Sequence, residues 1–328
     1  MNLRMKRREL LKVLGGAVGW PLAVAAQERR RRPRIGVLLA GPPAAFANRI
    51  ADLRRGLEEH GYAEPERLEL IFRYSETEPD RLPALARELV ADDVDMIVTS
   101  ATPGVRAAMA ATSTIPIVIA AAADVVGSGL VASLARPGGN VTGLTLLIPD
   151  LAGKQLELIR EFVPGLTRVG ALRGQGEGAQ AFETIRAAAA AYGIEPHFED
   201  MDSYAGIASA FARMRDARCQ AVILVDGPAL NSARETVAEN ALIHRMPTVS
   251  TLRLFVDAGS LVAYGPNLGM MWRRAAYYVD RILKGASPRE LPVEQPSAFE
   301  LVINQKTAGL LGLTLSGALL ARADEVIE

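Results

Sequence analysis

The chain has 328 residues, of which 49% are hydrophobic, so it is long enough to form two domains with cores of their own. Its 37 basic residues balance its 37 acidic residues, which excludes the strongly basic surface typical of nucleic-acid-binding proteins. The single cysteine, Cys219, excludes an intramolecular disulfide and a zinc site built from several cysteines.

The N-terminal residues have the composition of an export signal. The stretch KRRELLKVLGGAVGWPLAVAAQ (6–27) joins a basic front, with Arg7 beside Arg8, to a short apolar run and a small-residue end. The apolar run is shorter than the roughly 20 residues of a membrane-spanning helix. Paired arginines are typical of a twin-arginine signal. We predict a signal peptide at 1–26, without a lipid anchor because no cysteine ends it, and a mature chain with 32 basic and 36 acidic residues.

From residue 33 onward, strand-like apolar runs alternate with helical patterns. The runs RIGVLLA, VDMIVTS and IPIVIAA are short, apolar and rich in β-branched residues, which is typical of buried strands. The predicted order is strand 34–40, helix 45–60, strand 67–74, helix 78–92, strand 94–100, helix 103–111, strand 115–121 and strand 140–147.

The same alternation starts again near residue 150. The predicted elements are helix 150–163, strand 168–173, helix 178–192, strand 195–200, helix 204–216, strand 220–226, helix 229–242 and strands 247–250 and 261–265. Such alternation favours parallel sheets built from βαβ units, and two similar series favour two similar lobes. Ligands bind beyond the carboxyl ends of the strands in such sheets. The predicted fold class is therefore α/β, with a ligand cleft between two lobes.

No set of residues in the sequence makes a convincing catalytic or metal site. P-loop, G-x-S-x-G and H-E-x-x-H motifs are absent. The three histidines have no second metal ligand three or four positions away, which favours structural or surface roles for them: His60, His197 and His244.

The stretch RGQGEGAQ (173–180) has two interpretations. Its glycines follow a predicted strand, and Glu199 and Asp200 end the next strand, as in a weak dinucleotide-binding fingerprint with Gly174 and Gly176. It can also be a cleft loop that presents backbone N–H groups to a ligand. The cleft loop is favoured because no residue downstream is a candidate for hydride transfer.

Small and polar residues follow several predicted strands. Ser100 and Thr102 precede a helix, so their hydroxyls can cap it or bind a ligand carboxylate at its positive end. Asp124 and Asp226 each follow a buried strand and can pair with a ligand ammonium or cap the next turn. Tyr264 ends LVAYG (261–265) and can stack on a ligand or pack between the lobes.

Five longer stretches, spread over nearly the whole mature chain, carry a family resemblance. They are DRLPALARELV (80–90), GLVASLARPGGNVTG (129–143), GKQLELIREFVPGLTRVGAL (153–172), AYGPNLGMMWRRAAYYVDRILKGASPRELPVEQPSAFELVIN (263–304) and LLGLTLSGALLARADEVIE (310–328). Together they resemble the substrate-binding proteins of ABC transporters, in the family that includes tryptophan- and tyrosine-type binders.

The resemblance implies a fold like that of type I periplasmic binding proteins, with crossovers at a hinge. We expect a basic linker at 27–33, a first lobe at 34–145 completed by 267–285, and a second lobe at 146–266 completed by 286–328. Carried over loop by loop, the expected ligand-binding residues are Gly41, Ser100, Ala101, Thr102, Asp124, Gly174, Gln175, Asp226, Gly227 and Tyr264.

The function that the resemblance implies is capture of a small organic solute, amino-acid-like or an aromatic acid, for an ABC importer. We expect a periplasmic, monomeric protein without catalytic activity, cofactor or metal, whose partners are the solute and a transporter permease. Two alternatives remain: an exported NAD(P)-dependent oxidoreductase that uses Gly174, Gly176 and Glu199, and a solute sensor that docks on a membrane receptor.

Overall fold

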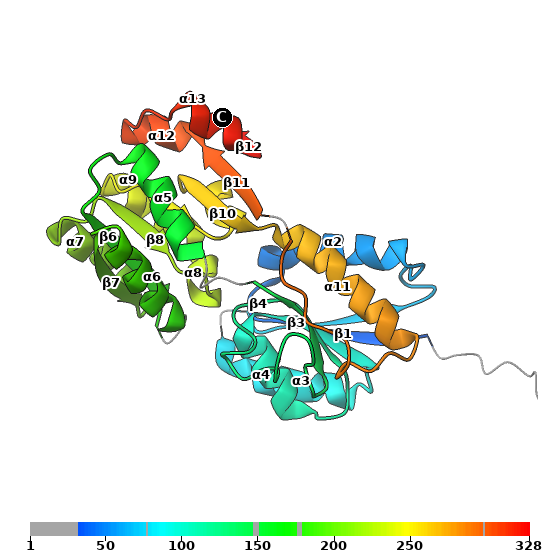
Figure 1. The fold of residues 1–328 in the computed structure, drawn as a ribbon. Helices are drawn as coiled ribbons and strands as arrows, with labels where there is room; N and C mark the ends of the chain where they lie inside the picture. The colour runs from blue at the N-terminus through cyan, green and yellow to red at the C-terminus, as the bar shows by residue number, and fades with distance from the viewer. Residues whose placement is uncertain (1–31, 77, 147–150, 176–178, 298) are drawn as a thin grey trace, which may run out of the picture.

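The computed structural model describes residues 32–328 except residues 77, 147–150, 176–178 and 298. The predicted signal peptide and most of the basic linker lie outside the described residues. The described chain forms two α/β lobes, each built around one sheet (Figure 1). Within the described ranges, no helix is long and apolar enough to cross a membrane.

The first lobe contains a parallel sheet in the order β2-β1-β3-β4-β5. Its strands are β1 (Arg34–Leu39), β2 (Glu69–Tyr74), β3 (Met96–Ser100), β4 (Ile117–Ala122) and β5 (Val141–Thr145). The central strands are buried throughout or nearly so, as expected when helices cover both faces. Gly143 is required at the contact between β4 and β5, because a Cβ atom there would lie 2.2 Å from the carbonyl oxygen of Ile119.

Helices cover both faces of the first sheet. On one face, α2 (Pro43–Glu59) packs along α11 (Leu268–Leu283), which comes from the far end of the chain (Figure 1). The buried residues of α2 recur three and four positions apart, which makes one apolar stripe: Phe46, Ile50, Leu53, Gly56 and Leu57. The other face is covered by η1 (Pro79–Arg81), α3 (Leu82–Ala91) and α4 (Ala101–Ala111).

The second lobe contains a larger sheet in the order β12-β11-β10-β9-β8-β6-β7. Its strands are β6 (Arg168–Gly174), β7 (Glu195–Met201), β8 (Ala221–Leu224), β9 (Thr248–Ser250), β10 (Val262–Pro266), β11 (Phe299–Asn304) and β12 (Glu325–Ile327). All neighbours are parallel except β10 and β11, which are antiparallel. The chain leaves this lobe at the carboxyl end of β10 and returns at the same end of the sheet. For this reason β11 runs in the opposite direction to β10.

Helices also cover both faces of the second sheet. One side has α5 (Ala152–Phe162), α6 (Ala179–Ala191), α12 (Gln305–Leu311) and α13 (Gly317–Arg322), and the other has α7 (Gly206–Asp216), α8 (Pro228–Ser232), α9 (Arg234–Ile243) and α10 (Arg253–Asp257). The single helix predicted at 229–242 is divided into α8 and α9 at Ala233. This division leaves α8 as a short helix directly after the segment that follows β8.

Three segments connect the lobes, between β5 and α5, between β10 and α11, and before β11. The third crossing lies later in the chain than residue 286. The N–H of Glu294 donates to the carbonyl oxygen of Gly143 at 2.9 Å, and the carbonyl oxygen of Glu294 accepts from the N–H of Thr145 at 3.0 Å. Residues around Glu294 therefore extend the first lobe, and we place the return to the second lobe at β11.

Candidate functional site

A cavity of about 750 Å³ lies between the lobes and is lined by residues of both. The first lobe contributes parts of α2, α4 and α11 and the segments that follow β1, β4 and β5. The second lobe contributes the start of α6 and the segment that runs from β8 through α8 into α9. These segments lie mostly at the carboxyl ends of parallel strands, where open α/β sheets bind ligands. The volume suits a small organic molecule.

The first-lobe wall of the cavity presents hydrogen-bond donors at the start of α4. Ser100 is buried at the N-cap position, but its hydroxyl makes no capping hydrogen bond. Ala101 has a φ of 58°, a strained conformation for a residue with a Cβ atom. The first N–H groups of α4 and the hydroxyls of Ser100 and Thr102 can therefore bind an anionic group at the positive end of the helix.

Arg49 adds a positive charge to the same wall. It lies on α2, and its guanidinium carbon is 5.0 Å from the centre of the Phe46 ring, which itself packs against Trp272 with ring centres 6.2 Å apart. The guanidinium has no hydrogen bond or ion pair with any residue that the structure describes. Burial lowers the pKa of Arg49, the charge of Asp226 opposes this, and Arg234 adds to the lowering. A half-buried guanidinium without an acceptor can be satisfied by a ligand oxygen.

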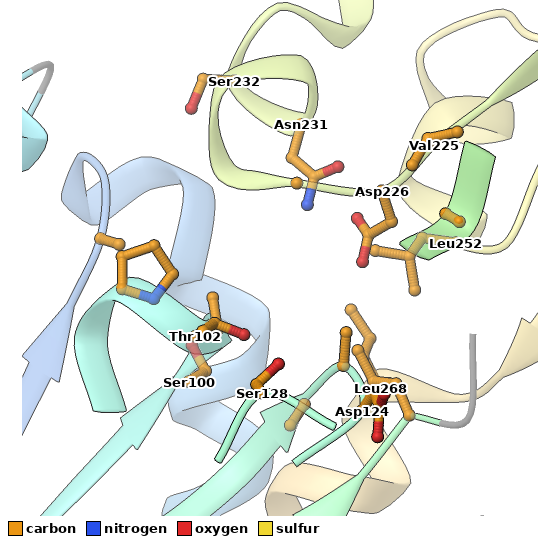
Figure 2. Close-up of a pocket in the computed structure, with 18 of the residues that line it drawn as sticks. Ser100, Thr102, Asp124, Ser128, Val225, Asp226, Asn231, Ser232, Leu252 and Leu268 are labelled. Atoms are coloured by element: carbon orange, nitrogen blue, oxygen red, sulfur yellow. The ribbon is translucent and has the colours of Figure 1, made fainter. Parts of the chain in front are cut away.

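The second-lobe wall presents hydrogen-bond acceptors. Asp226 follows β8 at the cavity, and Asn231 lies on α8. Oδ1 of Asp226 and Oδ1 of Asn231 are both buried, and neither has a hydrogen-bond partner within the described part of the chain. Burial raises the pKa of Asp226 to about 6, although hydrogen bonds from Asn231 and Gly227 and the charge of Arg49 favour the ionised form. Figure 2 shows Ser100 and Thr102 on one side of the cavity and Asp226 and Asn231 on the other.

The other charged side chains of the cavity have protein partners. Oδ1 of Asp124 accepts a hydrogen bond from the N–H of Gly127 at 2.8 Å, so this carboxylate caps a turn. Arg106 is exposed at the rim and donates to a backbone carbonyl of its own lobe at 3.1 Å. Arg234 pairs with its neighbour Glu235 at 2.6 Å. Arg49 and Asp226 are therefore the charged groups that most need a ligand.

Six of the residues predicted from the sequence line the cavity: Ser100, Ala101, Thr102, Asp124, Asp226 and Gly227. They come from the ends of β3, β4 and β8, which belong to different lobes. The structure therefore brings together strand-end loops that are far apart in the sequence.

Four predicted residues do not line the cavity, and we place them outside the candidate site. Gly41 is buried beside the Phe46 ring. Gly174 is buried at the end of β6, and the N–H of Gln175 is bonded to the carbonyl oxygen of Met201. Tyr264 stacks on Phe299, with ring centres 5.9 Å apart, within the second-lobe sheet. Gly41, Gly174 and Tyr264 therefore have packing roles, whereas Gln175 is exposed and is held by its backbone.

Two residues that sequence reasoning missed line the cavity with unpartnered polar atoms: Arg49 and Asn231. Arg49 lies inside a helix between the apolar positions Phe46 and Ile50, and there it has the pattern of an ordinary solvated residue. Asn231 lies in the stretch predicted as one continuous helix. No local signal identifies either residue, because the cavity forms only when the lobes face each other.

The acidic residues of the possible dinucleotide fingerprint are engaged with arginines. Arg213 donates to Glu199 at 2.6 Å, and Arg173 donates to Asp200 at 2.5 Å. Glu199 is also buried and bonded to His197 at 2.9 Å. Gly176 lies outside the described residues. Within the ranges that the structure describes, no three His, Cys, Asp or Glu side chains form a cluster suited to a metal ion.

Two α/β lobes with mostly parallel sheets, three connections and one cavity between them define a fold of the type I periplasmic binding protein kind. The model of the family of ABC transporter substrate binding proteins matches residues 37–327. The chain belongs to this family, whose members bind substrates outside the cytoplasmic membrane.

Individual relatives agree with the family assignment. A curated tyrosine-binding protein of Clostridioides difficile is 24% identical over 262 residues, which cover 79% of this chain and 75% of the relative. A conserved domain protein of Vibrio cholerae has a solved structure that is 30% identical, with a TM-score of 0.84, over 90% of this chain and 100% of its own. An ABC domain of Streptococcus pneumonia, solved in complex with L-Trp, is 28% identical, with a TM-score of 0.83 and the same coverage.

Proposed function

We propose that this protein captures a small organic solute, amino-acid-like or an aromatic acid, in the cavity between its lobes and delivers it to the permease of an ABC importer. The protein acts as a monomer after export to the periplasm through its twin-arginine signal. Its role is binding and release, without catalysis or a cofactor.

The observation that carries this proposal is the complementary chemistry of the two cavity walls. The first-lobe wall has donors, at Arg49 and at the start of α4, and the second-lobe wall has unpartnered acceptors, at Asp226 and Asn231. A solute with a carboxylate and a donor group fits between these walls. Because both lobes supply binding groups, the solute would favour closure of the lobes about their three connections.

The relatives support the same class of solute. One is named for tyrosine and another was solved in complex with L-Trp. The engagement of Glu199 and Asp200 by arginines disfavours a ribose-binding role, and with it the oxidoreductase alternative.

A thermal-shift screen tests the proposal. The mature protein is refolded to remove any retained solute and mixed with amino acids, aromatic acids, nucleosides, peptides and NAD(P). A solute at 100 times its dissociation constant adds about 2.7 kcal/mol to the free energy of unfolding, which raises Tm by several degrees. A shift with one class of amino acid or acid is expected. A shift with NAD(P) alone, or with no solute at all, would overturn the proposal.

Export is tested separately in the full chain. Replacing Arg7 and Arg8 with lysine keeps the charge but changes the residues that a twin-arginine receptor reads. The variant is expected to accumulate in the cytoplasm while the unaltered chain reaches the periplasm. Equal amounts of both in the periplasm would show that the arginine pair is not the address.

A further inference from the structure

Two oppositely charged side chains face the cavity from different lobes, and protein atoms satisfy neither completely. Arg49 comes from α2 of the first lobe and has no hydrogen-bond acceptor among the described residues. Asp226 comes from the end of β8 in the second lobe, and its buried Oδ1 has no donor there. Their charges influence each other's pKa, yet no ion pair within 4.0 Å joins them in the described chain. Both side chains line the same cavity without pairing with each other.

Closure of the lobes increases the free-energy cost of leaving either group without a partner. Removing water from Arg49 without supplying an anion, or from Asp226 without supplying a donor, is unfavourable because a buried charge needs a partner. The guanidinium cannot release its proton, so it requires an acceptor from outside the protein or from the opposite lobe. Asn231 adds to the need for a hydrogen-bond donor at the second-lobe wall, because its Oδ1 is a second unpartnered acceptor beside Asp226.

We propose that Arg49 and Asp226 together form a head-group clamp, in which Arg49 binds the carboxylate of the solute and Asp226, with Asn231, binds an adjacent amino or hydroxyl group. This inference rests on the proposed function and assigns the residues that decide solute class. It makes Arg49, which no sequence pattern identifies, the residue that selects acids. The start of α4 lies on the same wall as Arg49 and adds donors to the same carboxylate.

The packing of Arg49 suits this role. Its guanidinium lies over Phe46, and Phe46 is 6% exposed and packs against the fully buried Trp272. An arginine that is held against an aromatic face loses less freedom when it binds a carboxylate through two parallel hydrogen bonds. Arg55 lies on the same helix, is mostly exposed and pairs with Asp52 at 3.3 Å, so it provides a matched control outside the cavity.

The clamp is tested by calorimetry with three matched solute series, based on tryptophan, leucine and glutamate. Each series contains the amino acid, its α-carboxamide, its α-hydroxy acid and the acid without an amino group. The unaltered protein is expected to prefer an acid over its α-carboxamide, and an amino or hydroxy acid over the unsubstituted acid, by at least tenfold each.

The variants separate the two halves of the clamp. Arg49→Gln is expected to reduce the acid-over-amide preference to threefold or less while the second preference stays, and Arg49→Lys to restore part of it. Asp226→Asn is expected to do the reverse. Arg55→Gln should change neither, and the Tm of each variant without solute shows that it is folded.

Three results would overturn the clamp. The first is an unchanged acid-over-amide preference in Arg49→Gln. The second is loss of both preferences in both variants, which would mean that Arg49 and Asp226 pair with each other on closure. The third is that no series binds although the wider screen finds another solute. If that screen also finds nothing, the proposed function fails and not only the clamp.

Discussion

The two walls of the cavity differ in the kind of polar group that each leaves without a protein partner. The wall of the first lobe offers N–H and guanidinium donors, whereas the wall of the second lobe has two buried acceptors without partners. Elsewhere in the first lobe, the buried carboxyl group of Asp280 has a protein partner, because it accepts a hydrogen bond from Tyr62. The contrast indicates that the capacity to bind a solute comes from complementary polar groups that are left without protein partners on facing surfaces. Neither lobe alone has both the donors and the acceptors.

The largest expected effect tests whether the lobes fold as separate units. Phe211 is fully buried in the second lobe, and Leu53 is fully buried in the first. Phe211→Ala should cost about 3–5 kcal/mol and Leu53→Ala about 2–5 kcal/mol, through lost burial and the cavity that remains. Calorimetric scanning should show each variant lowering mainly the transition of its own lobe. Equal lowering of one shared transition would mean that the lobes unfold together.

A second effect concerns the free-energy cost of burying the ionised carboxyl group of Asp226. The folded state raises the pKa of Asp226 from 3.8 to about 6, so the ionised carboxyl destabilises the fold. The cost is absent below pH 4, grows between pH 4 and 6, and is complete above pH 6, where it is at most about 3 kcal/mol.

Asp226→Asn should therefore raise Tm at pH 7.5 and leave it nearly unchanged at pH 4. Asp216→Asn, at an exposed aspartate of the same lobe, is the control and should have little effect at either pH. A lower Tm for Asp226→Asn at pH 7.5 would mean that the carboxylate stabilises the second lobe.

A third effect concerns one connection between the lobes. Oδ1 of Asn267 accepts from the N–H of Met270 and caps α11, while its Nδ2 donates to Glu300 at 2.8 Å. Asn267→Ala removes both bonds and should lower the free energy of unfolding by about 1–2 kcal/mol. Chemical denaturation measures this loss. A change below 0.3 kcal/mol would show that water replaces the side chain at this connection.

The smallest effect compares two serines at helix starts. Ser316 caps α13 by accepting from the N–H of Leu319 at 3.1 Å, whereas the hydroxyl of Ser100 makes no such bond at α4. Ser316→Ala should cost about 1 kcal/mol, and Ser100→Ala less than about 0.5 kcal/mol. Denaturation of both variants without solute tests this. A larger loss for Ser100→Ala would mean that the first-lobe wall has a structural role.

Much of the fold could be predicted from local patterns of apolar residues in the sequence. The buried strands β1, β3 and β4 are short apolar runs, and the helices between them carry apolar residues at helical spacing. The antiparallel β11 and the break between α8 and α9 could not be read in this way. The direction of β11 depends on the end of the sheet at which the chain re-enters the second lobe. That end is determined by the packing of α11 in the first lobe.

The sequence by itself determined the alternation of strands and helices, the two-lobed class and the strand-end residues Ser100, Thr102, Asp124 and Asp226, because these follow from residue periodicity and from the rule that parallel strands bind ligands at their carboxyl ends. Only the tertiary structure decided that Arg49 and Asn231 face the same cavity and that Gly41, Gly174, Gln175 and Tyr264 do not line it. The physical reason is that a cleft between lobes is formed by side chains that are distant in sequence. A polar atom of such a side chain can be identified as unpartnered only when the positions of all its neighbours in the folded protein are known.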